Sequence, residues 1–168
     1  LPAIRTGRCL MRINLRVLGA RELQGRLNGD AGQDAMRKFI DRSAIFLQSR
    51  ARENIYGVGA VDTGRLGNSI GIEHEGDLTR LVGTNLPYGV VVEKGRSAGS
   101  KMPPQGALLG WMGRHGIPAD AEFQVRRGIA MNGIAPRPFF MPAIEATEQF
   151  MESILPDAAV QIEQEMSG

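Results

Sequence analysis

The longest periodic stretch of the chain runs from Asp30 to about Tyr56, and it constrains the fold more than any other feature. Small or apolar residues recur there every three or four positions, with charged residues between them. The recurring residues are Met36, Ile40, Ser43, Ala44, Leu47, Ala51, Asn54 and Ile55. This pattern predicts one amphipathic helix about 36–40 Å long, capped by Asp30 and ended by Gly57 and Gly59. Such a helix is long for a chain of 168 residues, so the other elements are expected to pack along it.

Several shorter segments have the alternation or the β-branched composition of strands. The segments predicted as strands are Met11–Leu18, Leu66–Glu73, Leu78–Thr84 and the valine-rich Tyr88–Glu93. The turn sequence Glu75-Gly76-Asp77 predicts that the second and third of these form a hairpin. A short helix is predicted over Ala20–Leu27, before the turn at Asn28.

Glycine and proline divide the rest of the chain into a loop and three helices. Gly95–Gln105 contains Pro103 and Pro104 and predicts an irregular loop. Helices are predicted over Gln105–His115, which contains Trp111, from Asp120 to Met131, and from Pro142 onward, with a kink or split at Pro156.

Together these elements predict the α+β class: a small antiparallel sheet packed against a long N-terminal helix and a C-terminal helix. The long loop before the Trp-containing helix completes the pattern. The length suits one domain over residues 1–168, with residues 1–10 as a disordered arm or upstream sequence.

The sequence contains no recognisable set of catalytic residues. It has two histidines and a single cysteine, Cys9, so an internal disulfide is impossible and a reducing compartment is expected. Nucleophilic catalysis needs a nucleophile, a base and an orienting group together, and no such set is present. No apolar run reaches the roughly 20 residues of a membrane helix, and no signal peptide follows Arg5 and Arg8. We therefore expect no enzyme activity, no cofactor and no membrane partner.

Three local patterns resemble ligand sites only superficially. Gly95–Lys101 resembles a phosphate-binding loop, but it has three residues between its glycines where the nucleotide motif has four. Glu73-His74-Glu75 offers metal-ligand types, yet on a strand the glutamates and the histidine would point to opposite faces. His115 lies at a predicted helix end, where an interaction with the terminal carbonyls is the simpler interpretation.

Charge is unevenly distributed, although the net charge is only +2. Residues 1–56 contain eleven basic and five acidic residues, whereas residues 138–168 contain six acidic and no basic residues. Two interpretations remain open: the basic half packs against the acidic helix within one molecule, or copies of the chain meet basic face to acidic face in a ring. The basic residues of the long helix also leave DNA binding open, although a solvated helix face is simpler. These residues are Arg37, Lys38, Arg42, Arg50 and Arg52.

Five short phrases between Val61 and about Ala146 resemble the tail-completion (neck) family of tailed bacteriophages. The first is Asp62-Thr63-Gly64 followed by Leu66 and Ser69-Ile70, and the second is the strand end Val82–Asn85. The third is Tyr88 with Val92–Gly95, and the fourth is Met102–Pro104 before Trp111. The fifth is Pro136–Ala143. Gly67 and Lys94 depart from the commoner residues of that pattern. The residues that carry the resemblance are Asp62, Thr63, Gly64, Leu66, Ser69, Gly83, Asn85, Tyr88, Glu93, Gly95, Pro103, Pro104, Trp111, Pro136, Pro138, Phe139 and Pro142.

The resemblance implies a structural virion protein, assembled in the host cytoplasm, whose copies form a hexameric ring at the head–tail junction. Its partners would be other copies of itself, the head-side connector or stopper, and the tail terminator or tube. DNA would pass non-specifically through the lumen. We expect the Gly95–Gln105 loop to contact a neighbouring ring or the lumen through Arg96, Ser97, Lys101 and Met102. The alternative is a DNA-binding accessory protein of a phage or prophage.

Overall fold

The computed structural model describes residues 11–16 and 30–167 and has the α+β architecture that the sequence predicts. It divides into two compact units. The first unit contains the described residues up to Leu86 together with those from Phe139 onward, and the second unit is Pro87–Pro138. The expectation of a single domain stays a prediction. The helix predicted over Ala20–Leu27 and the arm of residues 1–10 lie outside the described residues.

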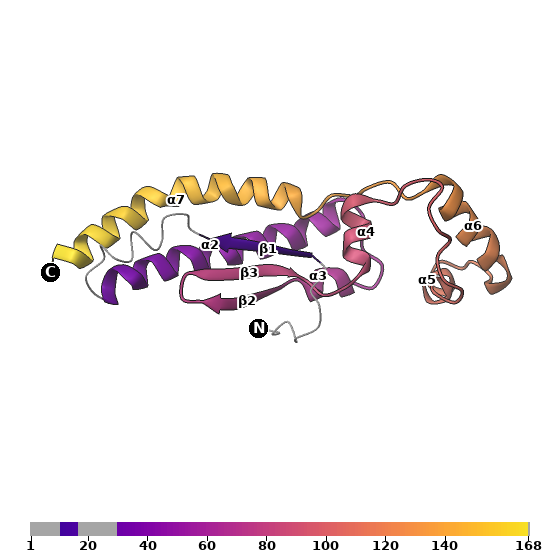
Figure 1. Cartoon of the computed structure of the whole chain (residues 1–168), viewed down its shortest axis with the longest axis horizontal. Coiled ribbons are helices and arrows are strands. Elements are labelled where there is room, and N and C mark those ends of the chain that lie inside the picture. The colour runs from indigo at the N-terminus through magenta and orange to yellow at the C-terminus, as the bar shows by residue number, and fades with distance from the viewer. Residues whose placement is uncertain (1–10, 17–29, 168) are drawn as a thin grey trace. The chain divides into compact units, whose positions relative to one another are not determined.

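The first unit is built on a three-stranded antiparallel sheet with the order β1-β3-β2 (Figure 1). Its strands are β1 (Met11–Arg16), β2 (Gly71–Gly76) and β3 (Thr79–Thr84). Val82 of the central strand is paired with Ile13 of β1 and with Ile72 of β2, and its own side chain is fully buried. The predicted strands at Met11 and Leu78 and the hairpin between β2 and β3 are therefore confirmed.

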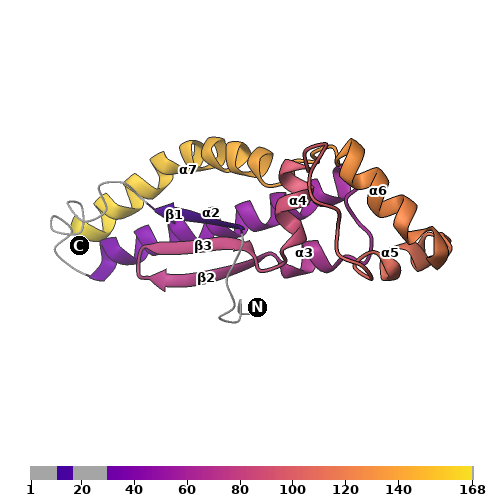
Figure 2. The same cartoon turned by 45° about the vertical axis from the view of Figure 1, so that its right-hand side comes forward.

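Two long helices accompany this sheet. They are α2 (Asp30–Gly57) and α7 (Met141–Ser167). α2 contacts both the sheet and α7, and the two helices run in opposite directions (Figures 1 and 2). Met36, Phe39 and Ile40 of α2 pack against Ile154 of α7. Apolar contacts of this kind supply most of the stability of long amphipathic helices.

α7 is a single helix through Pro156, so of the two outcomes predicted there, a kink or a split, the split does not occur. Pro156 is exposed, which leaves room for its ring on the outer side of the helix. Figure 1 shows the C-terminal part of α7 sloping away from the direction of its first turns. Apolar contacts on both sides of Pro156, at Ile154 and Ala158, hold the two parts against the same core.

Two segments predicted as strands are wholly or partly helical. Leu66–Glu73 begins as the helix α3 (Arg65–Ser69), and only from Gly71 onward is it a strand. Tyr88–Glu93 lies in the helix α4 (Tyr88–Lys94), even though it contains consecutive valines. Pro87 has helical backbone angles (φ −56°, ψ −35°) and starts α4, because a proline at a helix N-terminus forfeits no hydrogen bond. The preference of valine for strands is weak enough to be overridden in this way.

The second unit contains α4, the Gly95–Gln105 loop and two further helices. These are α5 (Leu109–Arg114), which is shorter than the predicted Gln105–His115, and α6 (Glu122–Asn132). A 3-10 turn, Ala119–Ala121, precedes α6, so Asp120 lies in that turn instead of capping the helix. The loop is irregular, as predicted. None of the helices in the described part of the chain is both long and apolar enough to cross a membrane.

Candidate functional site

The first family-like phrase, Asp62–Ile70, forms the connection between α2 and the sheet. Gly64 has a φ of 71°, the left-handed conformation that glycine adopts without strain, and it directly precedes α3. The helix buries Leu66, and the side chain of Ser69 donates a hydrogen bond to the Leu66 carbonyl at 2.7 Å. Asp62 and Thr63, at the start of this phrase, are exposed.

Side chains from α2 bind the carbonyls at the end of α3. The Arg52 guanidinium donates to the carbonyl of Gly67 at 3.1 Å and to that of Ile70 at 2.8 Å. Gln48 also donates to the Ile70 carbonyl at 2.8 Å. A cation at a helix C-terminus neutralises its partial negative charge. Because Gln48 and Arg52 are four residues apart on α2, one helix face positions both donors.

The second phrase, Val82–Asn85, ends β3 at the same place. The hydroxyls of Ser69 and Thr84 are 2.6 Å apart, and the Thr84 oxygen also accepts a hydrogen bond from the Leu86 amide at 3.1 Å. Gly83 lies in the ladder opposite Gly71, while Asn85 is exposed just beyond the strand. The first two phrases therefore form one polar joint between α2, α3 and β3. The sequence did not indicate the role of Gln48, Arg52 and Thr84 in this joint, although the i,i+4 spacing of the first two could have suggested paired donors.

The last phrase, Pro136–Ala143, leads into α7 and anchors its start. Phe139 and Phe140 are buried with their rings edge to face at a centroid distance of 5.9 Å. The side chain of Asn54, near the end of α2, donates to the Phe139 carbonyl at 2.9 Å. Pro142 lies in the first turn of α7, as predicted, whereas Pro136 and Pro138 lie in the extended segment before it.

The Gly95–Gln105 loop is fixed to other parts of the second unit. Arg96 and Ile134 exchange two backbone hydrogen bonds of 2.8 Å, and the Gly99 amide donates to the Ala130 carbonyl. Glycines at 95 and 133 allow this approach: a Cβ on Gly133 would lie 2.2 Å from the Arg96 oxygen, and one on Gly95 would lie 2.5 Å from the Ile134 oxygen. The loop is therefore a built structure held against α6 and the segment that follows it.

The four residues of this loop that were predicted to contact a neighbouring ring or the lumen differ in whether their side chains are available to a partner. Arg96 donates to the Ser100 hydroxyl at 2.9 Å and to the Lys101 carbonyl, so its guanidinium organises the loop from within. The Lys101 side chain is exposed and has no ion pair among the described residues. Ser97 is exposed and Met102 is half-buried. Of the two cations, Lys101 is therefore the one that remains available to a partner.

The helices of the second unit hold the other end of the loop. Arg126 of α6 donates to the Pro103 carbonyl at 2.7 Å, and the buried Glu122 accepts a hydrogen bond from the Gly106 amide at 2.6 Å. Pro103 is buried and Pro104 is exposed. Sequence reasoning missed Arg126 and Glu122, since nothing in their local pattern distinguishes them from solvated helix charges.

The remaining family-like residues are distributed over α4 and α5. Glu93 is buried in α4, whereas Tyr88 at its start is exposed. Trp111 is exposed on α5, with its ring 4.6 Å from that of His115. His115 follows the last residue of α5, and its ring nitrogen Nδ1 lies 2.9 Å from the Trp111 carbonyl, which confirms the predicted role at a helix end.

The possible metal ligands Glu73, His74 and Glu75 all lie on β2. Within residues 11–16 and 30–167, no group of three or more histidine, cysteine or acidic side chains is arranged to hold a metal ion. Glu73 and His74 face Leu81 and Arg80 across the ladder, within the β2–β3 hairpin. Arg80 itself binds Asp41 of α2 at 2.5 Å and the Gly76 carbonyl at 2.8 Å, so it ties the hairpin to α2.

Most of the basic side chains on α2 have partners within the first unit. Arg37 lies 3.8 Å from Asp77, while Lys38 pairs with Asp34 and Arg50 with Glu53, both at 2.9 Å. The hydrogen bond and the charge of Lys38 lower the pKa of Asp34 below its ordinary value. Arg52 is bound to the α3 carbonyls. Of the five basic side chains of this helix, only Arg42 has neither an ion pair nor a hydrogen bond to the described residues. A continuous phosphate-binding stripe along α2 is therefore poorly supported.

The acidic residues of α7 are arranged differently. Glu145, Glu148, Glu152 and Asp157 are exposed, and none of them forms an ion pair with a described residue. α2 and α7 instead meet through apolar groups, including the parallel rings of Phe46 and Phe150, whose centroids are 4.2 Å apart. These four acidic charges are thus not neutralised by α2, although the two helices pack together.

Comparison with known proteins identifies no relative of this chain. No protein-family model, curated protein or solved structure matches the chain. Any functional assignment therefore depends on the residues and their arrangement.

Proposed function

We propose that the chain is a structural subunit of the head–tail junction of a tailed bacteriophage, where its copies form a ring around the DNA channel. The ring would join the head-side connector or stopper to the tail terminator or tube. The proposal starts from the resemblance of the phrases between Val61 and Ala146 to tail-completion proteins. It gains support from their placement, because Asp62–Ile70, Val82–Asn85 and Pro136–Ala143 all lie at joints between elements.

The observation that carries the proposal is the composition of the second unit. Within Pro87–Pro138, all of which the structure describes, Met112 is the one large hydrophobic side chain that is fully buried. Six other large hydrophobic side chains of this unit are exposed: Tyr88, Leu109, Trp111, Phe123, Met131 and Ile134. Small units with so little core usually depend on a partner, and exposed apolar groups are typical of interaction surfaces. An assembly subunit accounts for both properties.

Charge also distinguishes the two units. Pro87–Pro138 contains seven lysine and arginine residues and three acidic residues, a net charge of +4, and the rest of the chain has a net charge of −2. Opposite charges on two parts of one subunit favour contacts between unlike parts of neighbouring copies. Such head-to-tail contacts close into rings when the rotation between copies permits.

The Gly95–Gln105 loop would act as a fixed protrusion that contacts either DNA or a neighbouring ring. Lys101 supplies the free cation, and Arg96 holds the loop in shape. A single lysine per copy, repeated around a ring, would place several positive charges near passing phosphates without reading base sequence. A DNA-binding accessory protein remains the alternative, but the paired charges on α2 remove its main support.

The test is a phage in which the gene for this chain is disrupted and then supplied in trans. We expect the disrupted phage to release unjoined heads and tails or to lose packaged DNA, and the wild-type gene to restore infectious particles. Lys101→Glu should restore them poorly, whereas Arg42→Glu, which makes the same charge change at an exposed residue of α2, should restore them fully. Normal particles without the chain would contradict the proposal, and salt-sensitive DNA binding by the isolated chain would favour the alternative.

A further inference from the structure

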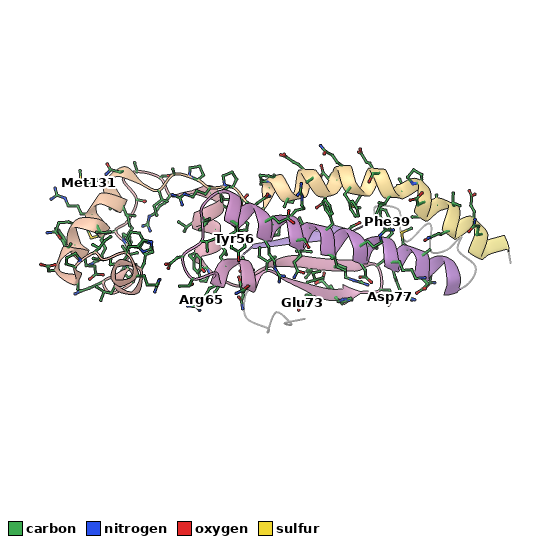
Figure 3. The ribbon with its side chains drawn as sticks, turned by 180° about the vertical axis from the view of Figure 1, so that it is seen from behind. Phe39, Tyr56, Arg65, Glu73, Asp77 and Met131 are labelled. Carbon is green, nitrogen blue, oxygen red and sulfur yellow. The ribbon has the colours of Figure 1, made fainter. Side chains whose placement is uncertain are left out.

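The exposed face of α6 carries a short stripe with an apolar residue at each end. Phe123, Arg127 and Met131 are spaced four residues apart, so they lie along one side of the helix over about 12 Å. All three are exposed, and Arg127 has no ion pair among the described residues. We call these residues the α6 stripe. Met131 is labelled at one end of it in Figure 3.

A stripe of complementary character follows α7. Glu145, Glu148, Glu152 and Leu155 recur at three-to-four spacing and are all exposed. Side chains along the outer side of α7 point away from α2 in Figure 3. Ile154, next to Leu155, points the other way and packs against α2, which fixes the rotation of the helix. We call these four residues the α7 stripe.

We propose that the α6 stripe of one copy docks on the α7 stripe of a second copy. Arg127 would lie between Glu148 and Glu152, and the apolar ends of the α6 stripe would cover Leu155 and the stems of the glutamates. The two stripes carry opposite charges, each has an exposed apolar residue, and their lengths are similar, about 12 and 15 Å. This inference rests on the proposed ring and specifies which surfaces form it.

The two kinds of side chain have different roles in this contact. Exposed ion pairs contribute little affinity but suppress wrong orientations, so Arg127 and the glutamates set the register. Burial of Phe123, Met131 and Leu155 would supply the affinity. Because the two stripes are different surfaces, each copy can bind one neighbour through its α6 stripe and another neighbour through its α7 stripe. Head-to-tail contacts of this kind can close into a ring.

The same features disfavour other occupants. DNA and anionic membranes would be repelled by Glu145, Glu148 and Glu152, which have no cation beside them to form an ion pair in the described structure. A pairing of two α7 stripes would place like charges together, and a pairing of two α6 stripes would do the same with Arg127. Of the self-associations that these two stripes allow, only the unlike pair brings opposite charges into contact.

Cysteine cross-linking tests the pairing directly. In the full chain carrying Cys9→Ser, we expect Met131→Cys and Leu155→Cys proteins to form a disulfide-linked heterodimer when they are mixed and oxidised. Neither protein alone should form a homodimer efficiently. Matched controls are Tyr56→Cys and Ile45→Cys, since Tyr56 and Met131 are 62% and 61% exposed and Ile45 and Leu155 are 56% and 55% exposed. Preorganised contact should make the test pair cross-link at least about tenfold faster than the control pair.

Charge reversal supplies a second readout. Arg127→Glu should slow the same cross-link, and combination with Glu148→Arg and Glu152→Arg on the other copy should restore it, a result that misfolding of the variant could not give. Heterodimers no faster than the controls, efficient homodimers of either variant, or loss without restoration would each overturn the docking. Such a failure would leave a ring formed by other surfaces intact. Absence of the chain from the particle would instead overturn the proposed function.

Discussion

Replacement of Phe139 by alanine is expected to lower the free energy of unfolding of the first unit by about 4 kcal/mol. The Phe139 side chain is 0% exposed, and its ring lies against that of Phe140. Its carbonyl accepts the hydrogen bond from Asn54, so the residue fixes the start of α7 against the end of α2. The truncation would leave a cavity at this point, and the neighbouring backbone is too constrained to fill it. Urea denaturation followed by far-ultraviolet circular dichroism measures the change.

Phe123→Ala provides the matched control. It removes the same atoms from a side chain that is 58% exposed on α6. We expect the unfolding free energy of this variant to stay within about 0.5 kcal/mol of wild type. If the two alanine substitutions lowered the free energy of unfolding by similar amounts, Phe139 would not be the anchor described above.

Replacement of Gly133 by alanine is expected to destabilise the second unit by about 3 kcal/mol or more. Gly133 has a φ of 73°, where any other residue is strained by about 1–2 kcal/mol. The added Cβ would also lie 2.2 Å from the Arg96 oxygen and 2.8 Å from the Ala98 nitrogen, which are backbone atoms that cannot rotate away. The loop and the Arg96–Ile134 bridge would have to separate, and overpacking of this kind costs a further 1–3 kcal/mol or so.

Gly99→Ala separates the cost of backbone strain at positive φ from the cost of the steric clash of the added Cβ. Gly99 has a φ of 75°, yet a Cβ there would meet nothing within 4 Å, so only the strain of about 1–2 kcal/mol should be lost. Trp111 is the single tryptophan of the chain and lies in the second unit, so its fluorescence during urea denaturation reports on that unit. Equal destabilisation by the two substitutions would show that the loop is not packed against Gly133.

The sequence predicted the elements whose signals are local and long. The three-to-four spacing of apolar residues placed α2 within one residue of its observed C-terminal end, at Gly57. Turn residues placed the hairpin between β2 and β3, and the proline-flanked phenylalanines placed the start of α7. In each case the residues that specify the element lie within it or directly beside it in the sequence.

The elements that the sequence did not predict depend on contacts with residues that are distant in the chain. α3 ends where Arg52 and Gln48 of α2 bind its carbonyls, and no window around Leu66 contains that information. α4 contains consecutive valines that are typical of strands, but the helical backbone of Pro87 starts a helix there. The prolines and glycines of the loop indicated irregular structure, yet the loop is held in place by Arg126 and by the close approach of Gly133.

The candidate site was predictable only in part for the same reason. The sequence identified Arg96 and Lys101 as equivalent cations of one loop. Only the structure separates them, because it shows the guanidinium bonded within the loop and the lysine exposed. The acidic character of α7 was visible in the sequence, but the absence of pairing with α2 depends on how Phe46 and Phe150 bring the helices together.

Electron cryomicroscopy of the neck of the intact particle tests the central proposal most directly. The account predicts a closed ring between head and tail in which each subunit shows the antiparallel pair of α2 and α7, and in which the density disappears when the gene is disrupted. A neck whose rings are all accounted for by other proteins, with this chain absent from the purified particle, would contradict it.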